Sequence, residues 1–429
     1  MMKEKKKIFV VGLDEFNLDK LNNLPGSREC DFLPALRYDE MRGPKKISIP
    51  DLINKSDIRI QEAGRIDAVV SFFDFPGSML VPVIAEKYHI PGPSLESVMK
   101  CEHKYWSRIE QQKVIPENVP DFKAFELSDD DSYNKIGLEP PFWIKPVKSY
   151  HSFLAYRITG PEQFKECIRK IRDKIDSIVE PFSYVFREYG MSWAISGMKE
   201  KMFAEAEASG HQCTIEGYSY GDEIETYGIV DSVRIAGRSS FSHYEYPSSL
   251  SEEICDRISD LSKRVIRQIG LNHSAFNIEY FYNEDKDELM LLEINPRISQ
   301  AHSDIFEKVH GISNHNVMLN MALNRRPDEF TYDGDFKFAA HFMHRTFKSG
   351  IVRKVPGKSE IDEMKKKYPD LVIKINVGKG LDLDDMPAAH IDSYSYVLAN
   401  IFIGAGSRNE LVEKYNDIVN NLTFEIEKK

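Results

Sequence analysis

The residues with the clearest chemical meaning lie in two apolar segments near the middle of the chain. The first segment reads Ala275-Phe276-Asn277-Ile278-Glu279-Tyr280-Phe281-Tyr282, and the second reads Leu289-Met290-Leu291-Leu292-Glu293-Ile294-Asn295-Pro296-Arg297. Side chains alternate between the two faces of a strand, so Glu293 and Asn295 share one face. If the segments form a hairpin that turns about Lys286, Glu279 lies directly opposite Glu293.

Opposed carboxylates on apolar strands predict a cation site. Like charges at paired positions repel, and burying them is costly unless a cation lies between them. Two carboxylates from Glu279 and Glu293 with the amide oxygen of Asn295 suit Mg²⁺, which takes waters and substrate phosphates as its other ligands. Arg297 adds a fixed positive charge. The alternative is an edge hairpin with two solvent-facing glutamates, which the apolar flanking residues disfavour.

The segments before this hairpin predict the elements that position it. In the first 93 residues, the apolar runs 7–12 and 68–73 alternate with a helix-like stretch at 78–88, which is typical of a parallel α/β domain. The strand ends at 12–14 and 74–77 then lie near a ligand mouth, unless they are simply turns. A dinucleotide site is disfavoured, because Gly12 stands alone without the G-x-G-x-x-G pattern.

Residues 94–429 predict a second, mixed α/β region. A helical pattern over 94–112 carries Lys104, and a strand at 141–146 carries Lys145 near its end. Further helices are predicted over 161–178, 250–269 and 407–421, with paired strands over 214–233.

Composition excludes several classes of protein. The 429 residues suggest two to four domains, and 57 Lys and Arg against 68 Asp and Glu give a net charge of −11, which disfavours a nucleic-acid binder. The most apolar window, 66–85, is interrupted by charges and prolines, so we expect no membrane span. The five cysteines form no C-x-x-C pair and fit reduced thiols of a cytoplasmic protein.

The order of these residues resembles the ATP-grasp superfamily, which includes carboxylate–amine ligases, biotin carboxylase and carbamoyl phosphate synthetase. The segment Glu293-Ile294-Asn295-Pro296-Arg297, with Glu279 one strand earlier, resembles the metal-binding segment of that superfamily. Lys104 and Lys145 resemble its two nucleotide-phosphate lysines. The resemblance implies ATP and Mg²⁺ (or Mn²⁺) as cofactors, with Glu279, Glu293 and Asn295 as metal ligands and Arg297, Lys145 and Asn295 as catalytic residues.

The resemblance also implies where the rest of the nucleotide binds. The segment 215–223 resembles the hinge between the two lobes, with Glu216, Gly217, Tyr218 and Ser219 beside the adenine and Glu223 on the ribose hydroxyls. In the loop 147–154, which lacks the usual glycines, Ser149 and Ser152 are expected to donate hydrogen bonds to phosphate. Arg234 or Arg238 is a candidate for the γ-phosphate or a substrate carboxylate, with an ordinary surface ion pair as the alternative.

Two further features bear on the reaction. Ala301 stands where biotin carboxylase-like members carry a catalytic glutamate, which argues against biotin carboxylation. Ser299, Gln300 and His302 are expected to line an acceptor pocket, although His302 fits a packed core histidine equally well. The stretch 180–210 is longer than the superfamily needs and predicts either a lid or a partner surface.

The fold expected is therefore α/β of the ATP-grasp type: an N-terminal parallel α/β domain over 1–93, a two-lobed ATP-grasp domain over 94–330 and a small C-terminal lobe over 331–429. The expected activity is a ligase that activates a small-molecule carboxylate as an acyl phosphate and joins it to an amine, with release of ADP and phosphate. The alternatives are a carboxylase, a carboxylate–thiol ligase, and a nucleotide-binding regulatory protein without catalysis. The resemblance also favours a homodimer.

Overall fold

The N-terminal part of the chain forms a parallel sheet covered by helices in the computed structural model, which describes residues 4–42, 47–148, 154–191, 201–238, 240–386 and 395–428. Its strands lie in the order β2 (Cys30–Arg37), β1 (Lys6–Leu13) and β3 (Ala68–Val70), and both pairings are parallel. Its helices are α1 (Glu15–Asn22), α2 (Tyr38–Arg42), α3 (Ile49–Ala63) and α4 (Gly77–Lys87). The central strand is apolar and buried over residues 8–12, as expected for a parallel sheet. The predicted parallel α/β architecture is confirmed.

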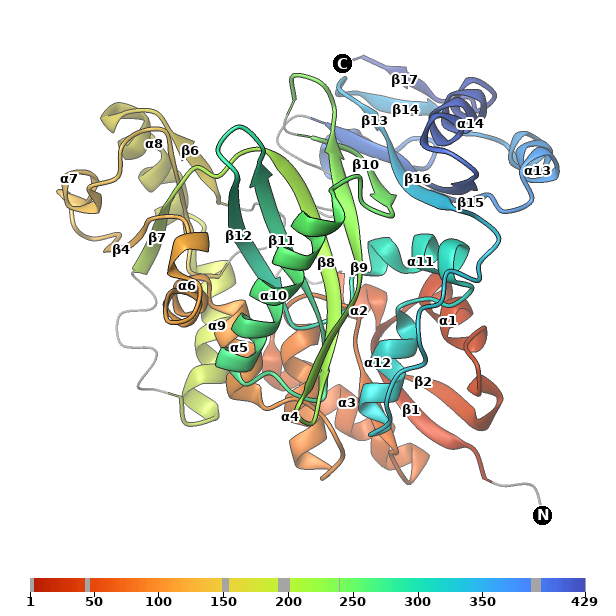
Figure 1. Ribbon diagram of the computed structural model, residues 1–429, viewed down its shortest axis with the longest axis horizontal. Coiled ribbons are helices and arrows are strands. Elements are labelled where there is room, and N and C mark those ends of the chain that lie inside the picture. Colours follow the sequence, from red (N-terminus) through yellow and green to blue (C-terminus); the bar gives the residue numbers. More distant parts are fainter. Residues whose placement is uncertain are drawn as a thin grey trace.

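A small antiparallel sheet follows, at the upper left of Figure 1. Its strands lie in the order β4 (Phe122–Glu126), β7 (Lys201–Ala206), β5 (Phe142–Pro146) and β6 (Tyr156–Ile158). The helices of this part of the chain are α5 (Leu95–Glu102), α6 (Lys104–Gln112), α7 (Ser132–Ile136), α8 (Pro161–Arg172) and α9 (Asp176–Glu188). The apolar stripe of α8 packs on this sheet, whereas Phe182, Val185 and Phe186 of α9 join the core of the N-terminal domain.

A large antiparallel sheet forms the middle of the molecule. Its eight strands lie in the order β12 (Glu288–Asn295), β11 (Ser274–Asn283), β8 (His211–Tyr220), β9 (Glu223–Arg234), β10 (Phe241–Tyr246), β13 (Phe338–Thr346), β16 (Tyr396–Ala405) and β15 (Val372–Ile375). The amphipathic helix α10 (Glu252–Ile269) buries its apolar stripe against one face of this sheet. The opposite face carries the polar side chains described below.

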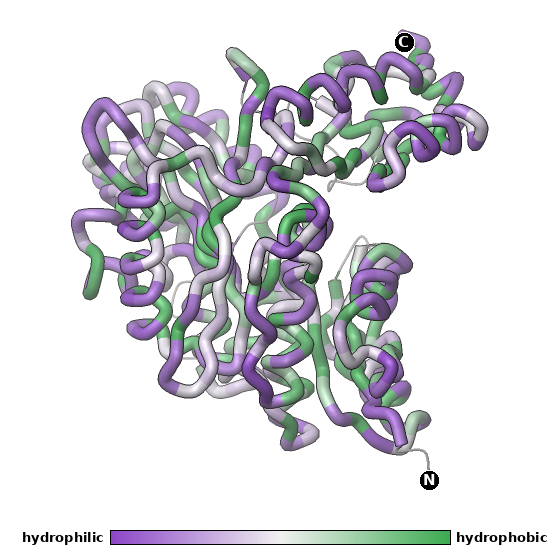
Figure 2. The backbone as a smooth tube through the Cα atoms, turned by 45° about the vertical axis from the view of Figure 1, so that its right-hand side comes forward, coloured by the Kyte–Doolittle hydropathy of each residue, from purple (hydrophilic) through white to green (hydrophobic). Residues whose placement is uncertain are grey.

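The remaining elements follow β12 in the sequence. They comprise α11 (Ser303–His310), α12 (His315–Ala322), α13 (Lys358–Lys367), α14 (Arg408–Asn420) and the strand pair β14 (Ile351–Lys354) and β17 (Glu425–Glu427). Short 3-10 turns occur at Ser27–Glu29, Pro116–Asn118, Gln300–His302 and Leu383–Asp385. Figure 2 shows apolar stretches on the interior strands and hydrophilic residues on the outer helices and loops.

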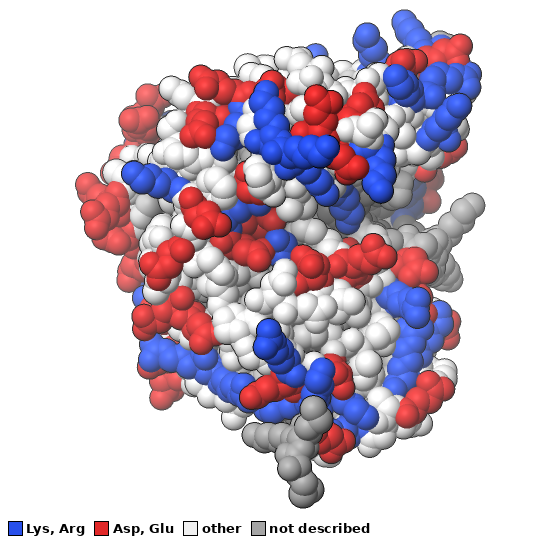
Figure 3. Space-filling view, turned by 90° about the vertical axis from the view of Figure 1, so that its right-hand side faces the viewer, with Lys and Arg blue, Asp and Glu red and all other residues white. Residues whose placement is uncertain are grey.

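The charged surface is mixed in sign on the face shown in Figure 3, where acidic and basic side chains are interspersed. None of the described helices is long and apolar enough to cross a membrane.

Most predicted elements form, with two differences in their bounds. The helix expected over 94–112 is two helices, because His103 takes an extended conformation and its ring accepts a hydrogen bond from Trp106 N, which starts α6. The helix expected over 161–178 ends at Arg172, and α9 begins at Asp176. The domain boundaries stay predictions, although the large sheet runs across residue 330, since β10 pairs with β13.

Candidate functional site

The hairpin of β11 and β12 brings Glu279 and Glu293 together as the sequence predicts. The two residues are direct partners in the antiparallel pairing, and Asn277 pairs with Asn295 two residues further along. Thr214 of β8 extends the row of Glu279, and Glu216 extends the row of Asn277. Two carboxylates and two carboxamides thus stand on one face of the large sheet, on the strands nearest the small antiparallel sheet.

The two carboxylates of this pair have pKa values shifted in opposite directions. Burial, and then the charge of Glu293, raise the pKa of Glu279 to about 7. Burial also raises the pKa of Glu293, but the nearby Lys104 ammonium outweighs it and holds that pKa below its usual value. Lys104 Nζ lies 2.5 Å from Glu293 Oε1, while Gln212 Nε2 donates to Glu279 Oε2 at 3.2 Å. Below about pH 7 Glu279 therefore favours its protonated form, while Glu293 stays ionised.

Asn295 and Arg297 continue the site beyond the carboxylates. Asn295 Nδ2 donates to Asn277 Oδ1 at 3.0 Å, which leaves Asn295 Oδ1 facing Arg297 Nη2 at 3.4 Å. Arg297 Nη2 also lies 3.3 Å from Asp74 Oδ2, and Nη1 donates to Ile298 O. Arg297 Nε is buried and has no hydrogen-bond partner among the described residues, so the guanidinium retains a donor for a ligand.

The two predicted lysines meet the hairpin in the cleft between the small and large sheets. Lys104 begins α6, and its backbone N–H donates to Val147 O at 2.8 Å, just after the strand that carries Lys145. A recess of about 240 Å³ is lined by both lysines and by Glu293, with Cys101, Ser107, Arg108, Gln111, Phe203, Glu205, Leu292 and Ile294. The structure therefore brings Lys104, Lys145 and Glu293 together in one cleft.

Two charged residues of this cleft were not predicted from the sequence. Glu205 of β7 forms an ion pair with Lys145 and lies 2.9 Å from Arg108 Nη2. Burial raises the pKa of Glu205, but Lys145 and Arg108 lower it to about 2, so the carboxylate stays ionised. Arg108 lies four residues after Lys104 on one helix face, a spacing that could have revealed it. Glu205 lies in the stretch 180–210, whose pattern gave no such signal.

A second buried ion pair lies beside the N-terminal domain. Lys148, whose side chain is 2% exposed, pairs with Glu102, and its Nζ lies 3.8 Å from Asp74 Oδ1. Burial lowers the pKa of Lys148, but the charges of Glu102 and Asp74 raise it above its ordinary value. Asp74 thus contacts both Lys148 and Arg297, which supports the expectation that 74–77 faces the ligand mouth.

The hinge predicted at 215–223 is wrong, because these residues belong to one hairpin of the large sheet. β8 and β9 are antiparallel neighbours, and the segment that joins the small sheet to the large one is 207–210. One end of β11 lies next to that link, because Tyr282 pairs with His211. At the other end of β11, Ser274 pairs with Ser219. The turn before Glu223 therefore lies away from the small sheet, at the lower end of the two strands in Figure 1.

The individual residues of that segment are also poorly placed for a nucleotide. Glu216 is fully buried and accepts hydrogen bonds from Tyr227, Asn314 and the His302 ring. Gly217 lies so close to Phe276 and Glu225 that a Cβ would meet them at 2.4 Å. Tyr218 and Ser219 are buried, and Glu223 pairs with Arg326 at 3.5 Å. These five residues do not join Lys104 and Lys145, so their predicted roles at the nucleotide are not supported.

Several other candidates have defined places. His302 is the packed alternative, since its Nδ1 contacts Glu216 in the core at 2.7 Å. Arg234 donates to Gln212 Oε1 at 2.6 Å and stacks on Phe241, whereas Arg238 lies over Phe347. Gln300 Oε1 faces Asn17 Nδ2 at 3.3 Å. Ser149 and Ser152 lie outside the described residues.

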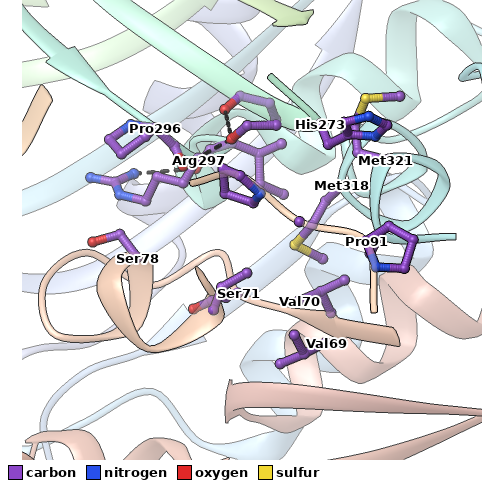
Figure 4. A pocket seen from close by; sticks show the side chains of 17 residues that line it. Val69, Val70, Ser71, Ser78, Pro91, His273, Pro296, Arg297, Met318 and Met321 are labelled. Carbon is purple, nitrogen blue, oxygen red and sulfur yellow. Dashed lines mark hydrogen bonds between the residues drawn. The ribbon is translucent and has the colours of Figure 1, made fainter. Parts of the chain in front are cut away.

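A second recess, of about 460 Å³, lies behind Arg297 (Figure 4). Val69, Val70 and Ser71 of the N-terminal domain line one side, and His273, Met318 and Met321 line the other. Its walls are mostly apolar, and Arg297 is the charged side chain that borders it.

The cation site can be compared with the ligands that metals prefer. Among the described residues, no group of three or more His, Cys, Asp and Glu side chains is placed to hold a metal ion. The opposed pair with Asn295 offers two carboxylates and one amide, which fits Mg²⁺ when waters and phosphates complete the coordination. The raised pKa of Glu279 is the mark of an acid pair that an added cation would stabilise.

Comparison with protein families gives a match over the cleft and the hairpin. Residues 138–304 match the family described as the ATP-grasp domain. The carbamoyl phosphate synthase large chain of Rubrobacter xylanophilus is 28% identical over 264 residues, which cover 58% of this chain and 22% of that protein. The chain thus spans about a fifth of the length of this relative.

Comparison with solved structures gives matches over the whole chain. The L-amino acid ligase from Bacillus licheniformis superposes with a TM-score of 0.71 at 16% identity, covering 100% of both chains. Phosphoribosylglycinamide synthetase from Anaerococcus prevotii gives 0.65 at 14% identity, covering 99% of this chain and 100% of that one. Biotin carboxylase from Campylobacter jejuni gives 0.65 at 14%, covering 99% and 93%. At this identity the likeness shows the fold, and the predicted ATP-grasp fold is confirmed.

Proposed function

Because the chain carries an ATP-grasp domain, we propose that it is an ATP-dependent ligase that joins a small-molecule carboxylate to an amine. It activates the carboxylate as an acyl phosphate, the amine displaces the phosphate, and ADP and inorganic phosphate are released. The observation that carries the proposal is the convergence of Glu279, Glu293, Asn295 and Arg297 with Lys104 and Lys145 in one cleft.

The carboxylates and the amide would hold the metal of the nucleotide. Glu279 and Glu293 are already opposed, so a Mg²⁺ or Mn²⁺ ion between them and Asn295 would relieve their repulsion. When bound, the ion would neutralise charge on the phosphates of ATP. Lys104 forms an ion pair with Glu293. With the metal ion bound to Glu293, the Lys104 ammonium would be available to a phosphate oxygen.

The remaining cations would position the phosphates and the acyl oxygen. Phosphoryl transfer depends on positioning and charge neutralisation more than on a covalent residue. Lys145 is held by Glu205, and Arg297 has a buried Nε–H without a partner among the described residues. Ser149 and Ser152 follow β5 in sequence and would add hydrogen-bond donors. The nucleotide base would lie near the link 207–210, because that segment borders the cleft between the sheets.

Among the ligase reactions that this fold could carry out, we prefer amide formation. The fold is shared over full length with an L-amino acid ligase, and Ala301 stands where biotin carboxylase-like members carry a glutamate. A carboxylase and a carboxylate–thiol ligase remain the alternatives within the fold, and a regulatory nucleotide-binding protein is the alternative outside catalysis. We further propose a cytoplasmic location and a homodimer.

The test is the set of products formed from ATP, Mg²⁺ and candidate carboxylates. An acyl phosphate route gives ADP and phosphate only when the right carboxylate is present, and hydroxylamine traps the intermediate as a hydroxamate. AMP as the main product would contradict this route, and ATP binding without any turnover would favour the regulatory protein. The matched control is Glu293→Gln, which should form neither ADP nor hydroxamate.

A further inference from the structure

An acidic residue of the N-terminal domain reaches the proposed reaction centre. Asp74 follows β3 at the carboxyl end of the parallel sheet, and its Oδ1 accepts a hydrogen bond from Phe75 N at 2.7 Å. Asp74 Oδ2 lies 3.3 Å from Arg297 Nη2, and Oδ1 lies 3.8 Å from Lys148 Nζ. Its charge also acts on Glu293, whose pKa it raises in opposition to Lys104. Asp74 therefore brings a carboxylate of the N-terminal domain to Arg297 and Lys148.

Asp74 differs from the other carboxylates that border the lysines. Glu102 is tied to Lys148 and Ser78, and Glu205 is tied to Lys145 and Arg108. The side chains of Glu102 and Glu205 are each 4% exposed, whereas that of Asp74 is 24% exposed. Of these three carboxylates, that of Asp74 is therefore the most accessible.

The proposed reaction needs such a group. An aliphatic amine arrives at neutral pH as an ammonium ion, which has no lone pair and cannot attack the acyl phosphate. The lysines, Arg108 and Arg297 attract the phosphates and the carboxylate, but as cations they cannot accept a proton from an ammonium ion. Glu279 and Glu293 are assigned to the metal. Outside that pair, Asp74 is a carboxylate that contacts Arg297.

We propose that Asp74 binds the ammonium group of the amine substrate beside Arg297 and accepts one of its protons. This role rests on the ligase function proposed above. The acyl phosphate and R–NH₃⁺ give the amide, HPO₄²⁻ and one proton. As the C–N bond forms, the C–O bond to phosphate breaks and phosphate leaves with its electron pair. One of the two protons lost by nitrogen leaves on the phosphate, and Asp74 passes the other to solvent. The cations of Arg297 and Lys148 disfavour a further positive charge and so favour the loss of that proton.

The variant that isolates this role is Asp74→Asn. Asparagine retains an oxygen that can accept the Phe75 N–H, but it has no charge and cannot take a proton. Hydroxylamine is a weaker base that is largely uncharged near neutral pH, so its attack does not need Asp74. The matched control is Asp57→Asn, which removes a carboxylate paired with Lys87 and Tyr88 in the same domain, away from the cleft.

The experiment compares two amines with each variant. In the first reaction, the protein, ATP and Mg²⁺ are incubated with a mixture of the standard amino acids, and the dipeptides formed are measured by mass spectrometry. The second reaction also contains excess hydroxylamine, and the hydroxamates formed are measured. Asp74→Asn should lose about 100-fold or more of dipeptide formation near neutral pH but retain hydroxamate formation within about threefold. Dipeptide formation by the variant should recover about tenfold per pH unit as the uncharged amine increases. Asp57→Asn should match the wild type in both reactions.

Several outcomes would overturn the inference. Equal losses of dipeptide and hydroxamate would mean that Asp74 serves the activation step or binds the ammonium group of the activated amino acid. Unchanged dipeptide formation would mean that another group takes the proton. If wild-type protein forms neither ADP nor hydroxamate with any carboxylate tested, the ligase function itself fails, and the role of Asp74 fails with it.

Discussion

Two glutamates on neighbouring strands of the large sheet have opposite environments. Glu216 of β8 pairs with Asn277 of β11, and Glu279 lies two residues along β11 on the same face. Glu216 is fully buried, and its two oxygens accept hydrogen bonds from Tyr227, Asn314 and the His302 ring. Glu279 accepts a hydrogen bond from Gln212 and stands opposite another carboxylate, Glu293.

The difference separates a structural carboxylate from one that we propose to bind a metal ion. Donors supplied by the protein itself compensate the burial of Glu216, which is what a stable core requires. The Glu279–Glu293 pair is left with like charges opposed; Lys104 forms the ion pair with Glu293, while Arg297 and Lys148 offset part of the remaining charge. Such a local conflict is expected where the missing partner is a ligand. The residue type and the apolar context are the same at both positions, so only the set of neighbouring donors distinguishes them.

The largest expected effect is the loss of turnover in Glu293→Gln. The change removes a charge from the proposed metal site, so ADP formation should fall by about 10³-fold or more. Because the change also removes a repulsion, the protein should remain folded, as measured by circular dichroism and the melting temperature without metal. Glu288→Gln, at the exposed start of the same strand, should keep its activity. Full activity in Glu293→Gln would contradict the proposal that Glu293 binds the metal ion whereas Glu216 is structural.

The converse change, Glu216→Gln, should act on stability. Glutamine keeps one acceptor oxygen and places an NH₂ group against neighbouring donors, which leaves buried groups unpaired. The free energy of unfolding should fall by about 2–4 kcal/mol, measured by urea titration. Glu225→Gln, whose partner Lys263 is on the surface, should change it by less than about 0.5 kcal/mol. A stable but inactive Glu216→Gln protein would instead assign Glu216 a role at the site.

The lysines of the cleft should govern nucleotide affinity. Lys145→Met removes a cation that Glu205 holds in the recess, so the Kd for MgATP should rise about tenfold or more, measured by isothermal titration calorimetry. Lys104→Met should weaken binding similarly. Lys113→Met, which removes an exposed lysine paired with Glu110, serves as the control. If both cleft variants bind as tightly as the wild type, the nucleotide binds elsewhere.

A further expected effect is a pH dependence of stability that comes from Glu279. Its pKa is raised from 4.5 to about 7, so between these values the folded protein holds a proton that the unfolded chain has released. The contribution of Glu279 to metal-free stability therefore falls as pH rises through this window, by at most about 1.4 kcal/mol per pH unit, and is flat above it.

The measurement is the difference in unfolding free energy between wild type and Glu279→Gln across that window. Taking the difference cancels the buried histidines, such as His315, whose pKa is lowered to about 3 and which destabilise the protein toward low pH. A difference that does not change with pH would show that burial and Glu293 do not raise the pKa of Glu279 in the folded protein.

Much of the fold and the centre of the site could be predicted from local patterns. Period-two alternation and the polar turn after Asn283 placed Glu279 opposite Glu293, and the structure has that pairing. The amphipathic period predicted α10 within two residues. Such features depend on neighbours in sequence, which is why a single chain reveals them.

The errors arose where long-range contacts decide. Glu216 and Glu223 were assigned to the nucleotide because their spacing resembled a hinge, but the pairing of β8 with β9 and β11 places them in and beyond the sheet. Arg108, Glu205 and Gln212 come from three different elements, and their partners are far away in sequence. No local pattern records a contact of that kind.

The sequence by itself therefore determined the opposed carboxylates, the adjacent amide and arginine, and the strands and helices that carry them, because each follows from side-chain periodicity within a short segment. Only the tertiary structure decided which charged groups meet: Lys104 with Glu293, Lys145 with Glu205, and Asp74 with Arg297. These pairs join residues from different sheets and helices. Their strength depends on burial and distance, which are properties of the packed molecule and not of any one segment.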